Sequence, residues 1–294
     1  MSTLHSTPAA FADAVSIAYR YVSAGPGAAL GPRASGGPVA IPDGLNDLAV
    51  EQAYRLQHEV VDTLVRQWGV ARAGFKISCT GAADRARIGA LEPTYGTLTN
   101  AHLLDSGATI DLAGTNQPLV EPELVFRLIR EPATDATFEE LADSVEVAAG
   151  LEVPICRFRN WWPEGAMPNL TLGSLIGDNS VAGFVVVSPR WVRLTAAEID
   201  AMEVELYAPD GQVSRGHATN VLGSPLAALS WLMGATQRRG VGMPAGSMVS
   251  SGTLTNPIRS VQGTFTATYP LVGDVTVTFA DPKLSEERNN NNGA

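Results

Sequence analysis

The segment V-E-P-E-L-V-F at residues 120–126 constrains the fold more than any other part of the chain, because it places carboxylates inside an apolar run. In a β-strand, residues i and i+2 point to the same face. Glu121 and Glu123 should therefore share one face of a strand, with the apolar residues beside them on the other. A third carboxylate, Glu152, lies in a similar run, G-L-E-V-P at residues 150–154.

Carboxylates in apolar surroundings are costly to bury unless something positive neutralises them. An all-oxygen set of acidic ligands suits a hard cation such as Mg²⁺ or Mn²⁺. The alternative is that the glutamates line an exposed strand face or pair with nearby arginines. On spacing alone the two interpretations carry equal weight. The candidate arginine partners are Arg127, Arg157 and Arg159.

Composition narrows the class of protein. The 294 residues are 45% hydrophobic and 17% charged, which is typical of a soluble globular protein with a sizeable core. A net charge of −10 disfavours nucleic acid as a partner. No apolar run reaches transmembrane length, and the N-terminus lacks the pattern of a signal peptide. Only two cysteines, Cys79 and Cys156, in a chain of this length are typical of a reducing cytoplasm. Taken together, these features lead us to expect a cytoplasmic protein that binds neither nucleic acid nor membrane.

The hydrophobic periodicity predicts an α+β protein. Helical spacing at 7–24 and 47–69 predicts a helical N-terminal part over 1–72. Short Val/Ile/Thr-rich segments then predict a β-rich body over 73–282, followed by a disordered polar tail at 283–294. One helix is predicted inside the body, at 223–239. The predicted strands include 74–78, 108–112, 182–188, 203–209, 248–254 and 274–280.

Several other residues are candidates for function, each with a structural alternative. Lys76 in G-F-K-I-S would commonly be a solvent-facing lysine, but it is also a candidate cation beside the acidic site. The hydroxyl-rich segment 249–257 suits either a turn or a loop that holds a carboxylate or carbonyl oxygen. Asp178 and Asn179 suit an ordinary turn. Trp161 and Trp162 are expected to seal a core edge or a subunit interface.

These segments resemble the elements of one enzyme family, in the same order. G-F-K-I-S-C-T resembles the G-x-K-x-G-L-T element of the 2-oxopent-4-enoate hydratase and 4-oxalocrotonate decarboxylase family, within the fumarylacetoacetate hydrolase-like superfamily. V-E-P-E-L-V-F matches its E-x-E metal strand, and G-L-E-V-P-I-C-R-F-R-N-W matches A-L-E-V-x-x-S-R-x-x-D-W. P-A-G-S-M-V-S-S-G-T-L resembles A-G-D-x-x-L-S-G. The resemblance covers roughly residues 45 to 282.

The resemblance implies a mixed β-roll with a helical N-terminal part and Mg²⁺ or Mn²⁺ at the mouth of the roll. It implies a lyase of the hydratase type that acts on a short 2-oxo or 2-hydroxy-dienoic acid through a metal-stabilised enolate, in a protein that assembles as a homo-oligomer. The implied metal ligands are Glu121, Glu123 and Glu152, and the implied catalytic residue is Lys76. The implied substrate-binding residues are Ser251, Gly252 and Thr253.

The sequence departs from the family pattern at motif positions. Hydratases of the family usually carry an aspartate where this chain has Thr94, and decarboxylase members often lack it, which favours decarboxylation as an alternative. Ser224 replaces a histidine shared by both groups, and Ser247 replaces an aspartate usual in hydratases. These changes indicate an atypical member. A fumarylacetoacetate-type C–C hydrolase and a non-catalytic relative are further alternatives, the latter disfavoured by the complete set of three glutamates.

Overall fold

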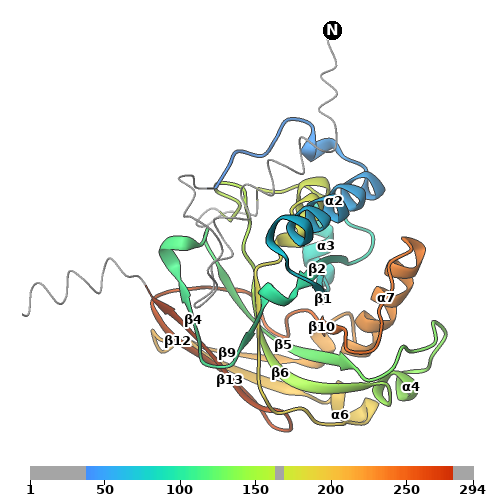
Figure 1. Cartoon of the computed structure of the whole chain (residues 1–294). Coiled ribbons are helices and arrows are strands. Elements are labelled where there is room, and N and C mark those ends of the chain that lie inside the picture. The colour runs from blue at the N-terminus through green and yellow to red at the C-terminus, as the bar shows by residue number, and fades with distance from the viewer. Residues whose placement is uncertain (1–37, 163–168, 281–294) are drawn as a thin grey trace, which may run out of the picture.

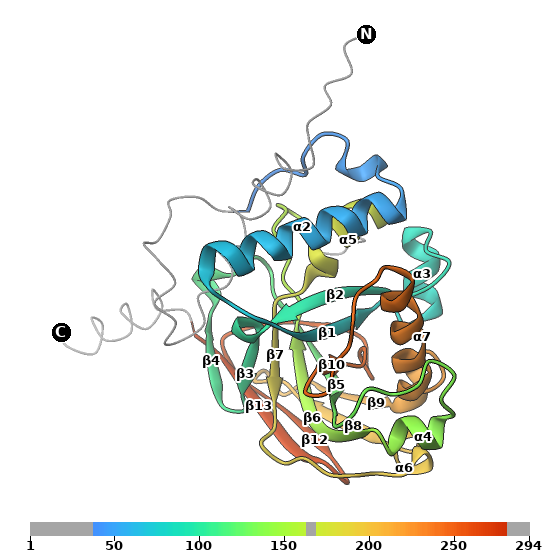
Figure 2. The same cartoon turned by 45° about the vertical axis from the view of Figure 1, so that its right-hand side comes forward.

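A computed structural model defines residues 38–162 and 169–280 of the chain (Figures 1 and 2). The helix expected at 7–24 and the tail expected from 283 lie outside the described residues. The body combines helices with two β-sheets, so the expected α+β class is confirmed. No helix of the described ranges is both long enough and apolar enough to cross a membrane.

The two long helices lie where the periodicity places them. The first, α2, spans Val50–Trp68 and ends at Gly69, whose left-handed backbone (φ 66°) closes the last turn. The second, α7, spans Pro225–Arg238, with Ser224 as its N-cap and proline at its first position. The shorter α-helices are α3 (Ala82–Ile88), α4 (Phe138–Ala142), α5 (Leu172–Gly177) and α6 (Ala196–Asp200).

The larger sheet carries the segments singled out by the sequence. Its strand order is β2-β1-β10-β5-β6-β7-β3, with β11 pairing to β5 outside this path. The β1–β10 and β3–β7 pairs are parallel, whereas the others are antiparallel. The strands are β1 (Arg72–Ser78), β2 (Thr94–Thr99), β3 (Leu103–Asp105), β5 (Leu119–Leu128), β6 (Val145–Val153), β7 (Phe184–Val187), β10 (Met248–Ser250) and β11 (Ile258–Arg259).

The smaller sheet has the order β4-β13-β12-β8-β9. Its strands are β4 (Ala108–Asp111), β8 (Glu203–Tyr207), β9 (Val213–His217), β12 (Gly263–Tyr269) and β13 (Gly273–Ala280). The main core lies between the two sheets and includes Leu124 and Phe126 of β5 together with Phe265 and Phe279. On the larger sheet, α2 and α5 pack together beside β2 (Figure 2).

The strand predicted at 248–254 ends early, so that prediction was wrong beyond Ser250. β10 pairs with β5 at Val125–Arg127, and β11 pairs with the same strand at Leu119–Val120. Between these pairings the chain leaves the sheet as a loop, residues 251–257, that passes the middle of β5. This detour brings backbone and hydroxyl groups to the level of the two β5 glutamates.

Candidate active site

The three glutamates lie on one face of the larger sheet. The strand register places Glu121 directly opposite Glu152, and Glu123 opposite Gly150, across the β5–β6 pair. Facing residues in an antiparallel pair project to the same side. One carboxylate oxygen from each glutamate lies within 4.8 Å of the others. The alternation predicted for β5 is confirmed, because Leu124 and its even-numbered neighbours point into the core instead.

Burial makes this cluster electrostatically demanding. Glu123 and Glu152 are 0% and 1% exposed, whereas Glu121 is partly exposed. Burial, followed by repulsion from Glu152, raises the pKa of Glu121 to about 8. The same two causes, with repulsion from Glu121, raise the pKa of Glu123 well above its usual range. The protein therefore holds three carboxyl groups together at a point where burial and mutual repulsion oppose their ionisation.

Glu123 is held in one orientation by its Oε2 atom. The Ser250 hydroxyl donates to this oxygen at 2.5 Å, and the Gly252 backbone N–H donates at 2.9 Å. In the described part of the chain, Glu123 Oε1 and Glu152 Oε2 are buried without a hydrogen-bond partner. Buried polar atoms in folded proteins nearly always have a partner, so these two oxygens are available to bind a ligand.

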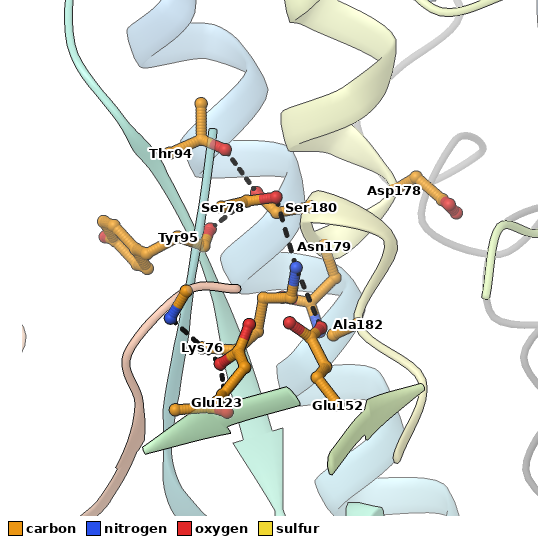
Figure 3. Close-up of polar contacts among 12 residues, drawn as sticks. Lys76, Ser78, Thr94, Tyr95, Glu123, Glu152, Asp178, Asn179, Ser180 and Ala182 are labelled. Atoms are coloured by element: carbon orange, nitrogen blue, oxygen red, sulfur yellow. Dashed lines mark hydrogen bonds and ion pairs between the residues drawn. The ribbon is translucent and has the colours of Figure 1, made fainter. Parts of the chain in front are cut away.

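Lys76 projects from β1 toward the same carboxylates (Figure 3). Its Nζ lies 2.9 Å from Glu152 Oε1 and donates to the Ser78 hydroxyl at 3.2 Å. The side chain is 1% exposed, which excludes a solvent-facing lysine. Burial is the largest single influence and lowers the pKa of Lys76, but attraction to Glu152 and the other two glutamates outweighs it and leaves the pKa raised. Lys76 is therefore a buried ammonium group at the site.

The arginines considered as alternative partners for the glutamates are engaged elsewhere. Arg127 pairs with Glu146 at 2.5 Å, and Arg157 pairs with Asp178 at 2.7 Å. The Arg159 side chain donates to the backbone oxygen of Pro38 at 2.5 Å. The glutamate cluster therefore needs some other source of positive charge besides Lys76.

The cluster fits a divalent cation. Oxygens on opposite sides of Mg²⁺ or Ca²⁺ lie about 4–5 Å apart, given metal–oxygen distances of about 2.0–2.6 Å. The glutamate oxygens lie within 4.8 Å of one another, which agrees with this range. The donor set is all oxygen, as hard cations prefer. Glu123 Oε1, Glu152 Oε2 and the partly exposed Glu121 would supply the ligands.

A cavity of about 100 Å³ lies beside the cluster. Lys76, Ser78, Glu121 and Thr253 contribute polar groups to its lining, and Asp84 and Arg87 of α3 add a charged pair. Apolar residues form much of the remaining wall. Trp161 belongs to a buried cluster, as expected for a core edge, and both tryptophans of the pair also face the cavity.

The three residues expected to bind substrate have different placements. Ser251 is buried, and its hydroxyl donates to the Gly252 carbonyl and accepts from the Leu124 N–H. The Gly252 N–H points to Glu123. Thr253 lines the cavity, and its hydroxyl donates to the Thr255 carbonyl. Of the three, Thr253 has its side chain at the cavity wall.

Sequence reasoning missed two residues that position the glutamates. Ser250 was treated only as part of a hydroxyl-rich segment, although its register opposite Lys76 on β1 places it on the glutamate face. The Tyr269 hydroxyl, from the smaller sheet, donates to the carbonyl oxygens of Glu123 at 2.9 Å and Gly150 at 3.0 Å. Only the packing of the two sheets brings Tyr269 there, so no local pattern announces it.

The segment after α5 was expected to be an ordinary turn, and it does more. Asp178 forms a fully buried ion pair with Arg157, whose side chain also donates to the Ala182 carbonyl. Asn179 pairs with both backbone groups of Thr97, at 2.7 and 2.8 Å. This segment therefore covers the free edge of β2.

The side chains of Thr94, His102 and His217 are tied to local structure. The Thr94 hydroxyl is buried and accepts a hydrogen bond from Ser180. The His102 ring accepts from the Thr99 N–H, and burial lowers its pKa to about 4. The His217 ring accepts from the Thr219 N–H. Both histidine rings therefore cap turns.

Comparison with known proteins then places the chain. A 2-keto-4-pentenoate hydratase from Burkholderia vietnamiensis is 31% identical over 234 residues, covering 78% of this chain and 86% of the relative. The chain belongs to the 2-keto-4-pentenoate hydratase family. A second member, 2-keto-4-pentenoate hydratase 2 from Dechloromonas aromatica, is 30% identical over 84% of this chain and 93% of its own length. The chain is accordingly an enzyme of the lyase class. No protein-family model matches it.

Among solved structures, 4-oxalocrotonate decarboxylase from Pseudomonas putida G7, complexed with magnesium and adipate, matches with a TM-score of 0.78. The match covers 93% of this chain and 98% of that protein at 20% sequence identity. At this identity the match shows the fold, and it confirms the mixed β-roll expected for this family. Solved neighbours carry magnesium or calcium, so a divalent cation is supported for the family's fold.

Proposed function

We propose that this chain is a divalent-metal-dependent hydratase that adds water to a short 2-oxo or 2-hydroxy-dienoic acid. One observation carries the proposal: buried carboxylate oxygens of Glu123 and Glu152 without partners lie in a three-glutamate cluster that reaches the wall of a cavity. The names of the relatives at 30–31% identity supply the reaction type. The remaining residues of the site are consistent with that chemistry.

The cation is proposed to be Mg²⁺ or Mn²⁺, held by Glu121, Glu123 and Glu152. When bound, such an ion supplies a Lewis acid for negative charge that develops on the 2-oxygen of the substrate. Ser250 and the Gly252 N–H hold Glu123 so that its Oε1 remains available. Tyr269 fixes the two strands from which the ligands project.

Lys76 is proposed to bind the substrate carboxylate or to transfer a proton at its Nζ. Its raised pKa keeps it charged, and Glu152 together with the Ser78 hydroxyl fixes its position. The apolar cavity wall limits the access of bulk water, which strengthens these electrostatic interactions. Thr253 would contact the bound acid from the loop.

Decarboxylation is a second candidate because of Thr94. The family resemblance places an aspartate at this position in hydratases, and here a buried hydroxyl bonded to Ser180 takes its place. A carboxylate that could activate water is therefore missing at that position. The decarboxylase fold match at 20% identity does not decide between the two reactions.

The test uses the purified full chain with Mn²⁺ and two substrates. We expect 2-hydroxypenta-2,4-dienoate to lose its dienol absorbance through hydration, with no release of CO2. Release of CO2 from 2-oxohex-3-enedioate, without hydration of the first substrate, would contradict the proposal and establish decarboxylation. Glu123→Gln serves as the inactive reference in both assays.

We further propose that the enzyme works in the cytoplasm as a homo-oligomer, as the family resemblance implies. Light scattering coupled to size-exclusion chromatography measures the mass directly. A monomer mass near 30.9 kDa at assay concentrations would contradict the oligomer.

A further inference from the structure

The cavity beside the carboxylate cluster is lined by two chemically distinct sets of side chains, a polar set and an apolar set. Lys76 and Glu121 belong to the polar set, where the proposed function places the 2-oxo acid head of a substrate. The other part is formed by apolar side chains from several segments. These side chains include Leu119, Pro154, Trp161, Trp162, Leu175 and Val181. Whatever extends from the head group into this part meets hydrocarbon and aromatic surface.

Two cations line the cavity, and each already has an anionic partner. Lys76 pairs with Glu152. Arg87 pairs with Asp84, one turn earlier on α3, with 3.2 Å between Nη1 and Oδ1. The Arg87 and Asp84 side chains are 34% and 49% exposed, so this pair lies at the open side of the cavity. A second carboxylate on a substrate would have to displace Asp84 from Arg87 and would be repelled by it.

The negative charge of Asp84 influences the pKa of a thiol that lines the cavity. Burial is the main reason that the pKa of the Cys79 thiol is raised to about 11, and Asp84 adds to this effect against the opposing influence of Lys76. The electrostatic environment near α3 thus opposes an additional anion.

We propose that the cavity selects 2-oxo acids whose far end is apolar and uncharged, and that Asp84 is a specificity-determining residue that rejects a second carboxylate by pairing with Arg87. This inference rests on the proposed function, because it assumes that the 2-oxo acid head binds at the carboxylate cluster. It adds a rule for the rest of the substrate. The acid should carry a hydrocarbon tail, and tails longer than that of a five-carbon acid should be accepted.

The first test measures binding of a homologous series to the Mn²⁺-loaded full chain by calorimetry: pyruvate, 2-oxobutanoate, 2-oxopentanoate and 2-oxohexanoate. Burying one methylene group strengthens binding by up to about fourfold, so affinity should rise about two- to fourfold at each step. Affinities that stay constant or fall along the series overturn the apolar part of the proposal. If pyruvate itself does not bind, the proposed function and this inference both fail.

The second test compares 2-oxopentanoate with 2-oxoglutarate, which differ in having a methyl or a carboxylate group at the far end. We expect 2-oxoglutarate to bind at least about tenfold more weakly, because its second charge loses water without gaining a free partner. Equal or tighter binding of 2-oxoglutarate, with pyruvate still bound, overturns this inference and leaves the proposed function intact.

The third test is a gain of binding. Asp84→Asn should improve the affinity for 2-oxoglutarate about two- to fivefold, the range expected when one partly exposed ion pair is exchanged for another. The affinity for 2-oxopentanoate should change less than twofold. The double variant Asp84→Asn/Arg87→Gln should lose the gain.

A matched control removes another surface aspartate–arginine pair, Asp62 with Arg72, which are 2.7 Å apart. Asp62→Asn should leave both affinities unchanged. Asp84→Asn without a gain for 2-oxoglutarate, or a gain that persists in the double variant, overturns the role assigned to Asp84.

Discussion

Two buried groups of charges lie in this protein, and they are completed in different ways. Asp178 and Arg157 are both 0% exposed, and they satisfy each other through an ion pair and additional hydrogen bonds to backbone atoms. Glu123 and Glu152 are as deeply buried, but each keeps an oxygen that nothing in the described structure satisfies. Lys76 supplies one positive charge against three carboxylates.

We infer that this difference separates a structural ion pair from a ligand-binding site. A fully satisfied polar network holds a segment in place, and here it fixes the loop that covers the edge of β2. A partly satisfied network costs stability unless a ligand completes it. The two groups are equally buried, but only the glutamate pair has side-chain oxygens without a hydrogen-bond partner in the described residues.

Removing the unsatisfied carboxylates should abolish cation binding. In Glu123→Ala/Glu152→Ala, we expect Mn²⁺ affinity measured by calorimetry to fall more than about 1,000-fold, equivalent to more than about 4 kcal/mol. The substitutions relieve repulsion among the carboxylates but also remove the Glu152 partner of Lys76, so circular dichroism is used to confirm that the variant is folded. Glu146→Ala is the control, because Glu146 lies on β6 like Glu152 but pairs with Arg127. Unchanged Mn²⁺ affinity in the double variant would refute the assigned site.

Breaking the satisfied pair should instead destabilise the fold. Arg157→Met leaves the Asp178 charge buried without its partner, which costs about 3–5 kcal/mol of unfolding free energy. Denaturant unfolding measures the loss. Arg127→Met breaks a partly exposed pair and should cost about 1 kcal/mol or less. Similar small losses in both variants would show that the Arg157 network is not important for stability.

Adding the cation should stabilise the wild-type chain. At a Mn²⁺ concentration 100 times its dissociation constant, the free energy of unfolding should rise by about 2.7 kcal/mol. Thermal unfolding with and without chelator provides the measurement. The double glutamate variant should show no such increase. A shift of equal size in that variant would mean that the ion binds elsewhere.

Loss of the Ser250 hydroxyl should weaken cation binding without removing it. Partners that orient metal ligands typically contribute about 10- to 100-fold in affinity, and because Gly252 still holds Glu123 we expect about tenfold for Ser250→Ala. Ser144→Ala removes a buried hydroxyl that donates to the Leu141 backbone carbonyl, and should leave the affinity unchanged. Equal effects from both variants would assign Ser250 a purely structural role.

The smallest effect is expected for Tyr269→Phe. The substitution removes one hydroxyl shared by two backbone carbonyls, so the free energy of unfolding should fall by about 1 kcal/mol. Those carbonyls belong to β5 and β6, which carry the three glutamates. Mn²⁺ affinity should therefore also fall, by about two- to threefold. A stability loss with unchanged affinity would separate Tyr269 from the site.

The sequence was informative wherever a pattern is local. Alternation along β5 placed Glu121 and Glu123 on one face, and helical periodicity located α2 and α7. The position of Glu152 opposite Glu121 depends on the register of two strands that are separated by about 16 residues, which alternation does not specify. Family resemblance supplied that link.

Other features depend on contacts between distant segments. Asp178 looked like a turn residue because its partner, Arg157, lies 21 positions away and could equally have paired with a glutamate. Lys76 and Ser250 become neighbours only because β1 and β10 are parallel and adjacent. The early end of β10 has the same origin: Gly252 adopts φ 103° and turns its N–H toward Glu123, so the strand cannot continue.

The cavity beside the glutamates draws its two parts from different elements of the fold. The proposed catalytic and metal-binding side chains lie on β1, β5 and β6, whereas α3, α5 and the segment around Trp161 contribute other parts of the cavity wall. Residues of that wall can change without disturbing the strands. A library restricted to wall positions such as Ile88 and Leu175 would therefore explore new substrates while the reaction stays constant. The same separation would allow duplicated genes of this fold to diverge in substrate preference while they conserve a single catalytic step.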